Sequence, residues 1–339
     1  MVDLITAPDA RLHVSVGKMP QPYIDAFDLP DDAKKYPTTR GFVVAFVTSA
    51  LRRRTAVVFP PGPYPLTSWR SAGRGVLAIT MSLLARTTGG ASVTVGKSVR
   101  GRHRGARAVE KVLIRISNIY VARDRLSAIS VGVPITAAPD LALLASPSDS
   151  STRRFVPLSF RSDRPLDVEF LRAVVDWART ESLVPVFVTQ VARDGARHAE
   201  HAAELGVDHL EWGAKSHRQQ LMDITALYSE SSLVVTDRLH AALLGVLGGA
   251  VPVAVRQGDS PSKIADALDG VMPYATLDRE DRSDVVESLH AATSLRGAVV
   301  AGRTAARARL LEIQRDVRLA TGLRYLQPPA TATPPHRVG

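Results

Sequence analysis

The chain has no cysteine among its 339 residues. Disulfide bonds and thiolate metal sites are therefore excluded, and we expect the protein to work in the reducing cytoplasm. The first residues carry Asp3, Asp9 and Arg11 where a secretion signal needs an uninterrupted apolar region, so we expect no such signal. The longest apolar runs, such as residues 239–255, contain His240 or fall short of the ~20 residues that cross a bilayer. We therefore expect no membrane-spanning helix.

Aromatic residues are also scarce, at 5%, although the chain is strongly basic, with a formal charge of +10. A positive surface attracts phosphates, nucleic acid or an anionic membrane. The densest basic run, RGRHRGAR at residues 100–107, contains no aromatic side chain on which a base would stack. We therefore expect a solvated loop at this run and no nucleic-acid partner.

The sequence does contain an alternation of strand-like and helix-like segments. A length of 339 residues with 45% hydrophobic content is enough for two hydrophobic cores. In the first half, runs rich in β-branched residues predict strands at residues 41–47, 55–60, 91–96, 118–122 and 129–136. Apolar residues at helical spacing predict a helix at residues 71–90, which ends on Gly89 and Gly90. Such strands joined by helices indicate a parallel sheet that is covered on both faces.

A second alternation follows the segment SPSDSS, residues 146–151, which is typical of a linker. Strands are predicted there at residues 154–160, 184–190, 207–212, 232–236 and 250–255. Helices are predicted between them at residues 165–182, 196–206, 217–231 and 238–249. The fold class is thus α/β, with two Rossmann-like domains, residues 1–145 and 152–322, facing a cleft. The second domain is expected to end in two helices, and the Pro-rich tail, residues 323–339, to be disordered.

An acid, an arginine and a histidine lie where the predicted strand 232–236 turns into a helix. These residues are Asp237, Arg238 and His240. Ligand sites of α/β proteins form at such strand ends, and the N-terminus of a helix offers N–H groups to an anion. The same spacing also fits a cap made by Thr236 or Asp237, with His240 packed in the first helical turn. Spacing alone leaves both interpretations open.

Other segments accompany this triplet in a fixed order. They read GKSVRG (96–101), VARDRLS (121–127) and AAPDLALL (137–144), and Lys263 follows about twenty residues after the histidine. Together with SLVVTD, RLH, AALLGVL, GG and AVPVAV, this set resembles the polysaccharide pyruvyl transferase family over residues 56–268. The chain departs from the family in lacking its early N-x-G-D turn, and the strand end that follows is altered to VFPPGPYP.

The resemblance implies a specific reaction. Members of the family move an enolpyruvyl unit from phosphoenolpyruvate onto two hydroxyls of a sugar, which gives a cyclic pyruvate ketal and phosphate. It implies phosphoenolpyruvate as co-substrate, with no cofactor and no metal. The implied acceptor is a sugar of a cell-surface polysaccharide or of its lipid-linked precursor. A basic surface suits an enzyme that works at the anionic inner face of a membrane.

The residues that match the family's motifs take over its roles. We expect His240 and Arg123 to be catalytic, with His240 acting as general acid or general base. Phosphoenolpyruvate carries a carboxylate and a phosphate, and the cations expected to hold it are Arg123, Arg238 and Lys263. The supporting residues are expected to be Asp124, Ser127, Asp140 and Asp237. The acceptor side is expected to include Gly62, Tyr64 and Ser98.

Structural alternatives exist for three of these cations. Arg123 and Asp124 can form an ion pair with each other at the strand end. Arg238 can lie along its own helix. Lys263 can be an ordinary first residue of a helix that Ser262 caps.

A pair of histidines raises the separate question of a metal. His198 and His201 are three residues apart in a helix-like segment, and Glu204 is close by. No third strong ligand accompanies them, so we expect an exposed polar helix face and no metal site.

Two other functions fit the same segments. A nucleotide-sugar glycosyltransferase of the GT-B class has the same two-domain architecture, and fold alone does not separate the two enzymes. Such an enzyme uses acidic residues to hold a ribose and a Gly-rich donor loop, whereas the strand end here is mainly basic. The third interpretation is a non-catalytic basic protein that binds an anionic polymer through residues 100–107 and has no need of His240.

Overall fold

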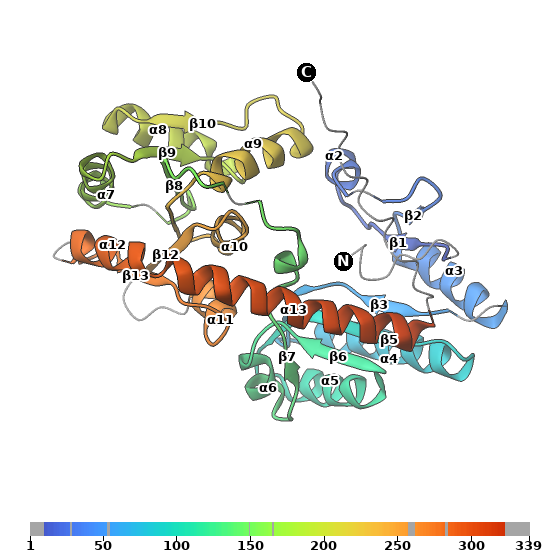
Figure 1. The fold of residues 1–339 in the computed structure, drawn as a ribbon. Coiled ribbons are helices and arrows are strands. Elements are labelled where there is room, and N and C mark those ends of the chain that lie inside the picture. The colour runs from blue at the N-terminus through green and yellow to red at the C-terminus, as the bar shows by residue number, and fades with distance from the viewer. Residues whose placement is uncertain are drawn as a thin grey trace, which may run out of the picture.

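The computed structural model describes residues 10–27, 29–52, 55–148, 150–164, 166–256, 262–281 and 284–322. The predicted tail at residues 323–339 lies outside the described residues. Each half of the chain forms a parallel sheet with helices against it, and the long helix α13 (Arg296–Thr321) runs from the second half back along the first (Figure 1). The α/β class and the helical C-terminal part are confirmed. None of the described helices combines the length and the apolar character that crossing a membrane requires.

The first half contains a parallel sheet in the order β3–β5–β6–β7, with β4 also paired to β5. Its strands are β3 (Val57–Phe59), β4 (Gly62–Pro65), β5 (Ser92–Arg100), β6 (Ile119–Ala122) and β7 (Thr136–Ala137). Its helices are α3 (Thr39–Arg52), α4 (Trp69–Thr87), α5 (Arg104–Ile116) and α6 (Leu126–Val131), followed by the short 3-10 helix η1 (Leu141–Leu144). A separate parallel pair, β1 (His13–Ser15) and β2 (Lys34–Tyr36), flanks α2 (Gln21–Asp25).

The strand predicted at residues 41–47 is wrong, because this segment lies within α3. Phe42, Phe46 and Ala50 recur every four residues and pack against α4 and β3. A short apolar run does not distinguish a strand from a buried helical face, so packing decided between them. The helix predicted at residues 71–90 is confirmed as α4.

Two further predictions in the first half need correction. Residues 129–136 do not form one strand, because α6 extends to Val131 and ends where Gly132 takes a left-handed φ of 76°. Residues 100–107 are not a loop, since β5 ends at Arg100 and α5 begins at Arg104.

The second half contains a six-stranded parallel sheet in the order β10–β9–β8–β11–β12–β13. Its strands are β8 (Phe155–Ser159), β9 (Val184–Val188), β10 (Asp208–Leu210), β11 (Leu233–Thr236), β12 (Val251–Arg256) and β13 (Ala275–Asp278). Its helices are α7 (Val168–Thr180), α8 (Gly195–Leu205), α9 (His217–Ser229), α10 (Leu239–Leu247), α11 (Lys263–Leu268) and α12 (Val285–Ser294), with the short 3-10 helix η2 (Ala192–Asp194) before α8. In chain order this is 3-2-1-4-5-6, the order of a doubly wound Rossmann sheet, whose switch point lies between β8 and β11. All five strands predicted for this half are confirmed.

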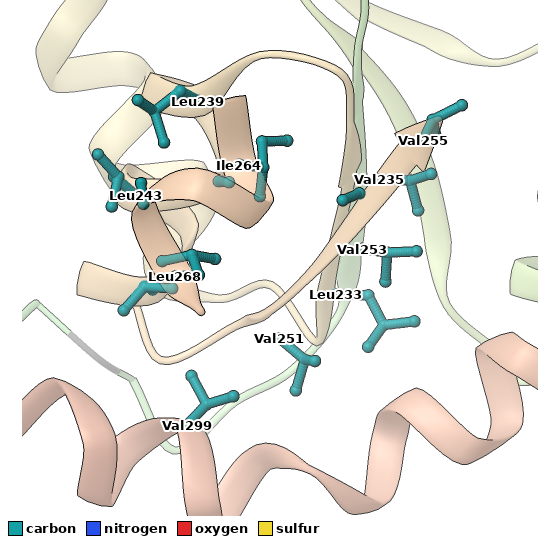
Figure 2. Close-up of a cluster of buried hydrophobic side chains, with 14 of the residues drawn as sticks. Leu233, Val235, Leu239, Leu243, Val251, Val253, Val255, Ile264, Leu268 and Val299 are labelled. Carbon is teal, nitrogen blue, oxygen red and sulfur yellow. The ribbon is translucent and has the colours of Figure 1, made fainter. Parts of the chain in front are cut away.

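The core of the second half fixes the start of α10. Leu239 and Leu243 of α10 and Ile264 of α11 lie over strands β11 and β12 in Figure 2, and all three side chains are buried. Burying a leucine stabilises the fold by about 1.5–3 kcal/mol. A Cβ atom at Gly245 would lie 2.5 Å from Val234 Cγ2, so α10 can approach β11 this closely only with glycine there. The helix that carries His240 is therefore held tightly.

Candidate active site

A cavity of about 2060 Å³ lies beside the sheet of the first half. It is lined mainly by β1, α3, β3, α4, parts of β4 and β5, the turn after β6, the start of η1, the first turn of α10 and the end of α13. Among the described residues, its lining contains one carboxylate, Asp140, and six Lys or Arg side chains: Arg11, Lys34, Arg52, Arg74, Lys97 and Arg123. Such a lining attracts an anionic ligand.

His240 enters this cavity from the second half of the molecule. Thr236 Oγ1 accepts the backbone N–H of Arg238 at 2.9 Å, and the chain turns from β11 into α10 without a side-chain cap. Leu239 points into the core, and His240 follows it 100° further around the helix, where it is exposed and lines the cavity. The structure therefore does not support the alternative in which His240 packs inside the first turn.

Arg123 and Asp140 form an ion pair in the same cavity. Arg123 follows β6, and its Nη1 lies 3.3 Å from Asp140 Oδ2. Asp140 Oδ1 accepts the N–H of Ala142 and so begins η1, which packs against α10. The partner of Arg123 is thus Asp140, and the alternative pair with Asp124 is wrong. Because a guanidinium has five N–H donors, this contact holds Arg123 and leaves it able to bind an anion.

Lys97 is a cavity residue that the sequence motifs did not single out. It is only 5% exposed yet lines the cavity, and its Nζ lies 2.6 Å from Glu110 Oε1 and 3.6 Å from the centre of the Tyr64 ring. Tyr120 donates a hydrogen bond to the same Glu110 oxygen. Burial lowers the pKa of the Lys97 ammonium, while Glu110 acts to raise it. The available signal was a lysine inside the motif GKSVRG, within a strand that is otherwise buried.

The backbone around Lys97 has an irregularity that places this side chain. The pairing of β5 with β6 shifts between Val95 and Lys97, and the residue between them, Gly96, has a φ of 78°. A Cβ atom on Gly96 would lie 3.0 Å from Pro61. Glycine therefore permits the bulge that aims Lys97 at the cavity.

Two of the three residues predicted on the acceptor side line the cavity. They are Gly62, which is the register partner of Lys97 on β4, and Tyr64, whose ring lies against the Lys97 ammonium. Ser98 does not line it, because its hydroxyl donates to Asp124 Oδ2 at 2.6 Å.

Asp124 and Ser127 belong to a buried network behind the cavity wall. Asp124 Oδ1 accepts hydrogen bonds from the Ser127 N–H and hydroxyl and pairs with Arg100 Nη1 at 2.8 Å. Ser127 Oγ accepts the N–H of Val99. Burial raises the pKa of Asp124, but the hydrogen bonds from Arg100, Ser98 and Ser127 together hold it below its ordinary value. This network fastens the turn after β6 to β5.

Arg238 and Asp237 lie at the switch point of the second sheet, outside the cavity lining. Arg238 pairs with the fully buried Asp194, so it does not lie along its own helix. Asp237 Oδ1 accepts the N–H of Arg161 at 3.0 Å, and burial raises the pKa of this carboxyl. Asp237 thus ties the ends of the neighbouring strands β11 and β8 together, and Arg238 ties the end of β11 to η2, which follows β9.

Lys263 is the exposed first residue of α11. Ser262 caps this helix by accepting the N–H of Ala265, which is the structural alternative foreseen for this segment. Asp266 of the same helix pairs with Arg100, so α11 is held near the Asp124 network. Lys263 does not line the cavity.

The expected exposed face of α8 is wrong, because His198 and His201 are both buried. His198 Nδ1 lies 3.0 Å from Thr189 Oγ1, and its Nε2 lies 2.9 Å from the Phe160 carbonyl oxygen. Burial lowers the pKa of His198 to about 4, so the ring is neutral and joins the ends of β8 and β9. The described residues contain no group of three His, Asp or Glu side chains that suits a metal ion.

Solved structures share this architecture. The UDP-GlcNAc 2-epimerase of Methanocaldococcus jannaschii has a TM-score of 0.50 at 10% identity, covering 86% of this chain and 89% of its own. The Neisseria meningitidis UDP-GlcNAc 2-epimerase bound to UDP-GlcNAc has a TM-score of 0.51 at 8% identity, and the match covers 89% of this chain and 91% of that protein. Arabidopsis thaliana UGT89C1 complexed with UDP-L-rhamnose has a TM-score of 0.51 at 12% identity, and the match covers 91% of this chain and 92% of that protein. At these identities the likeness shows the fold alone, which is that of GT-B glycosyltransferases and epimerases.

The family comparison is more specific than the fold. Curated proteins yield no match. The sequence model of the family described as polysaccharide pyruvyl transferase matches residues 23–258, which include the turn after β6, Asp140 and the first turn of α10. This match extends over more than half of the chain, and the chain therefore belongs to the polysaccharide pyruvyl transferase family.

Proposed function

We propose that this enzyme transfers pyruvate from phosphoenolpyruvate onto two hydroxyls of one sugar residue, forming a cyclic ketal and releasing phosphate. The acceptor is a cell-surface polysaccharide or its lipid-linked precursor. One observation supports this most strongly: His240, Arg123 and Lys97 come from three separate segments and line one basic cavity. A small trianion and a polar acceptor fit such a lining.

Arg123 and Lys97 are the cations proposed to contact phosphoenolpyruvate in the cavity. A guanidinium matches a carboxylate or phosphate with two parallel hydrogen bonds, and an ammonium adds a point charge. Asp140 fixes the Arg123 guanidinium, and Glu110 fixes the Lys97 ammonium. The ligand roles of Arg238 and Lys263 stay predictions. In the present structure Arg238 supports the turn that presents His240.

The proposed reaction balances with the groups of the two substrates. One hydroxyl oxygen bonds to C2 of phosphoenolpyruvate while the methylene carbon takes up a proton. A second hydroxyl oxygen then bonds to C2 as the bond from C2 to the phosphate oxygen breaks. The two hydroxyl protons balance those gained by the methyl group and the phosphate. His240 is proposed to move a proton in one of these steps, as general acid toward the methylene carbon or as general base toward a hydroxyl.

The experiment incubates the purified protein with phosphoenolpyruvate and a panel of free and lipid-linked saccharides. Phosphate release and the mass increment of a pyruvate ketal on the acceptor are followed together. We expect both in equal amounts with the wild type. His240→Ala should lose most of both, and His290→Ala, on the exposed face of α12, should retain them.

A parallel incubation supplies UDP-sugars in place of phosphoenolpyruvate, because the fold also occurs in proteins solved with UDP-GlcNAc and UDP-L-rhamnose. Transfer of a sugar from UDP, with no phosphate released from phosphoenolpyruvate across the panel, would overturn the proposal. That outcome would favour a glycosyltransferase. Binding of an anionic polymer with no turnover of either donor would favour a non-catalytic protein.

A further inference from the structure

The positive charge of this protein is concentrated in one segment. Residues 33–109 contain fourteen Lys and Arg residues and no Asp or Glu, although the whole chain has 43 basic and 33 acidic residues. The rest of the chain is consequently net acidic. The segment runs from β2 through α3, β3, β4, α4 and β5 into the first half of α5. A general basic composition would not produce such a division.

Helix α4 has an apolar stripe on its outer side. Trp69, Val76 and Leu83 are 75%, 51% and 47% exposed. Their spacing of seven residues, close to two helical turns, places them in one line along the helix. Gly73 and Thr80 lie between them, so the stripe contains no charge.

Helix α3 has a second stripe of the same kind. Val44, Val47 and Leu51 are exposed and lie on one side of this helix at i, i+3 and i+7. The opposite sides of α3 and α4 pack against each other through Phe46 and Met81. The two stripes therefore belong to neighbouring helices, which lie on the side of the molecule away from the second sheet (Figure 1).

Exposed arginines flank both stripes. They are Arg40 on α3 and Arg70 on α4, together with Arg52 at the end of α3, which also lines the cavity, and Arg86 on α4, whose guanidinium donates to the Ile116 carbonyl oxygen. Neither helix contains an acidic residue. We define the outer face of α3 and α4, with these arginines and the two stripes, as the basic-apolar face.

We propose that the basic-apolar face docks on the surface of an anionic lipid bilayer. Valine and leucine side chains gain by leaving water for the acyl boundary, tryptophan is favoured at the headgroup level, and arginines attract anionic headgroups. An anionic polymer in water offers no apolar phase to the stripes. A second copy of this face would bring cations against cations. A bilayer is the partner that satisfies both the stripes and the arginines.

The docked face is the outer side of a wall of the cavity. Phe42 and Phe46 of α3 and Leu77 and Met81 of α4 line the cavity from within. A bilayer on the outer side therefore lies next to the space where the acceptor is proposed to bind. The inference itself does not depend on pyruvyl transfer, because docking needs neither substrate.

The test is flotation of the full-length protein with vesicles of phosphatidylcholine alone or with added phosphatidylglycerol. We expect flotation only with the anionic vesicles, and less of it as salt is raised. Val76→Ser/Leu83→Ser and Val44→Ser/Leu51→Ser should each weaken binding about tenfold or more. Arg40→Gln/Arg70→Gln should weaken it roughly 25-fold, at about fivefold for each charge.

Matched controls change exposed apolar side chains and exposed arginines in the second half. Leu221→Ser/Met222→Ser on α9 and Arg172→Gln/Arg197→Gln on α7 and α8 alter exposed side chains and should float like the wild type. Thermal melting confirms that each variant folds. The inference is overturned if the wild type does not float with anionic vesicles, if the controls lose as much binding as the face variants, or if only a soluble anionic polymer is bound.

Discussion

The polar groups at the strand ends are used differently in the two sheets. In the second sheet Arg238, Asp237 and His198 are bound to other protein groups at the ends of the strands. In the first sheet Lys97 and Arg123 are also paired, but they line an open cavity. The Asp237 and Arg238 side chains of the second sheet therefore hold the turn that carries His240, while most of the cavity lining comes from the first half.

His240 belongs to the second half but lines the cavity beside the first sheet. Its replacement has the largest expected effect on activity. On the proposed mechanism His240→Ala removes the group that moves a proton, so kcat should fall about 10²- to 10⁴-fold with little change in the KM for phosphoenolpyruvate. Steady-state kinetics with a saturating acceptor measure both constants. A rise in KM with unchanged kcat would show that His240 binds the substrate and does not transfer a proton.

The Lys97–Glu110 pair tests whether the first sheet holds a buried charge. Lys97→Met leaves the Glu110 carboxylate buried without its cation and should lower the free energy of unfolding by about 3–5 kcal/mol. Lys97→Met/Glu110→Gln should recover most of that loss, because neither charge remains. Urea denaturation followed by circular dichroism compares the variants. Equal stability of the single and double variants would show that the pair is not buried in solution.

The second sheet should be the acid-sensitive region between about pH 6.5 and pH 4. The pKa of His198 is lowered by burial to about 4 in the folded protein, below its value of about 6.5 when exposed. The unfolded chain therefore takes up a proton first as the pH falls. Between about pH 6.5 and pH 4 this lowers the free energy of unfolding by roughly 3 kcal/mol.

His198→Gln should abolish this part of the pH dependence, although it also lowers stability at neutral pH. His290→Gln serves as the matched control, because its ring lies at the surface of α12. Denaturation midpoints measured from pH 7 to pH 4 give the pH dependence of stability for the wild type and both variants. An unchanged slope in His198→Gln would place the proton uptake elsewhere.

The two arginines give the smallest but most selective comparison. Arg123→Lys loses the forked donor set in the cavity and should raise the KM for phosphoenolpyruvate about tenfold. Arg238→Lys disturbs the pair with Asp194, so we expect it to lower stability more than it raises that KM. Kinetics and melting of the same two samples give the comparison. A larger rise in KM for Arg238→Lys than for Arg123→Lys would indicate that phosphoenolpyruvate binds at the end of β11, beside Arg238.

Much of the second sheet could be predicted from its sequence. Its strands are continuous apolar runs, and helices of ordinary length separate them, so pattern and structure agree. The first half was harder because residues 41–47 have strand-like composition, and only the packing of Phe46 against α4 decides for a helix. Local propensity gives way to tertiary packing at such a segment.

The candidate site could be predicted only in part. His240 and Arg123 stand in motifs, and the structure places both in the cavity. The contacts of Arg238 with Asp194 and of Lys97 with Glu110 join residues 44 and 13 positions apart, and no local pattern contains them. The burial of His198 likewise depends on strands that precede it by many residues. Pairing across the fold is the information that spacing lacks.

The most direct test of this account is a crystal structure of the His240→Ala variant with phosphoenolpyruvate bound. We expect the ligand in the cavity, beside position 240, with its anionic groups within hydrogen-bond distance of Arg123 and Lys97. Phosphoenolpyruvate bound instead to Arg238 and Lys263, with Arg123 and Lys97 still held by their carboxylates and away from the ligand, would contradict it.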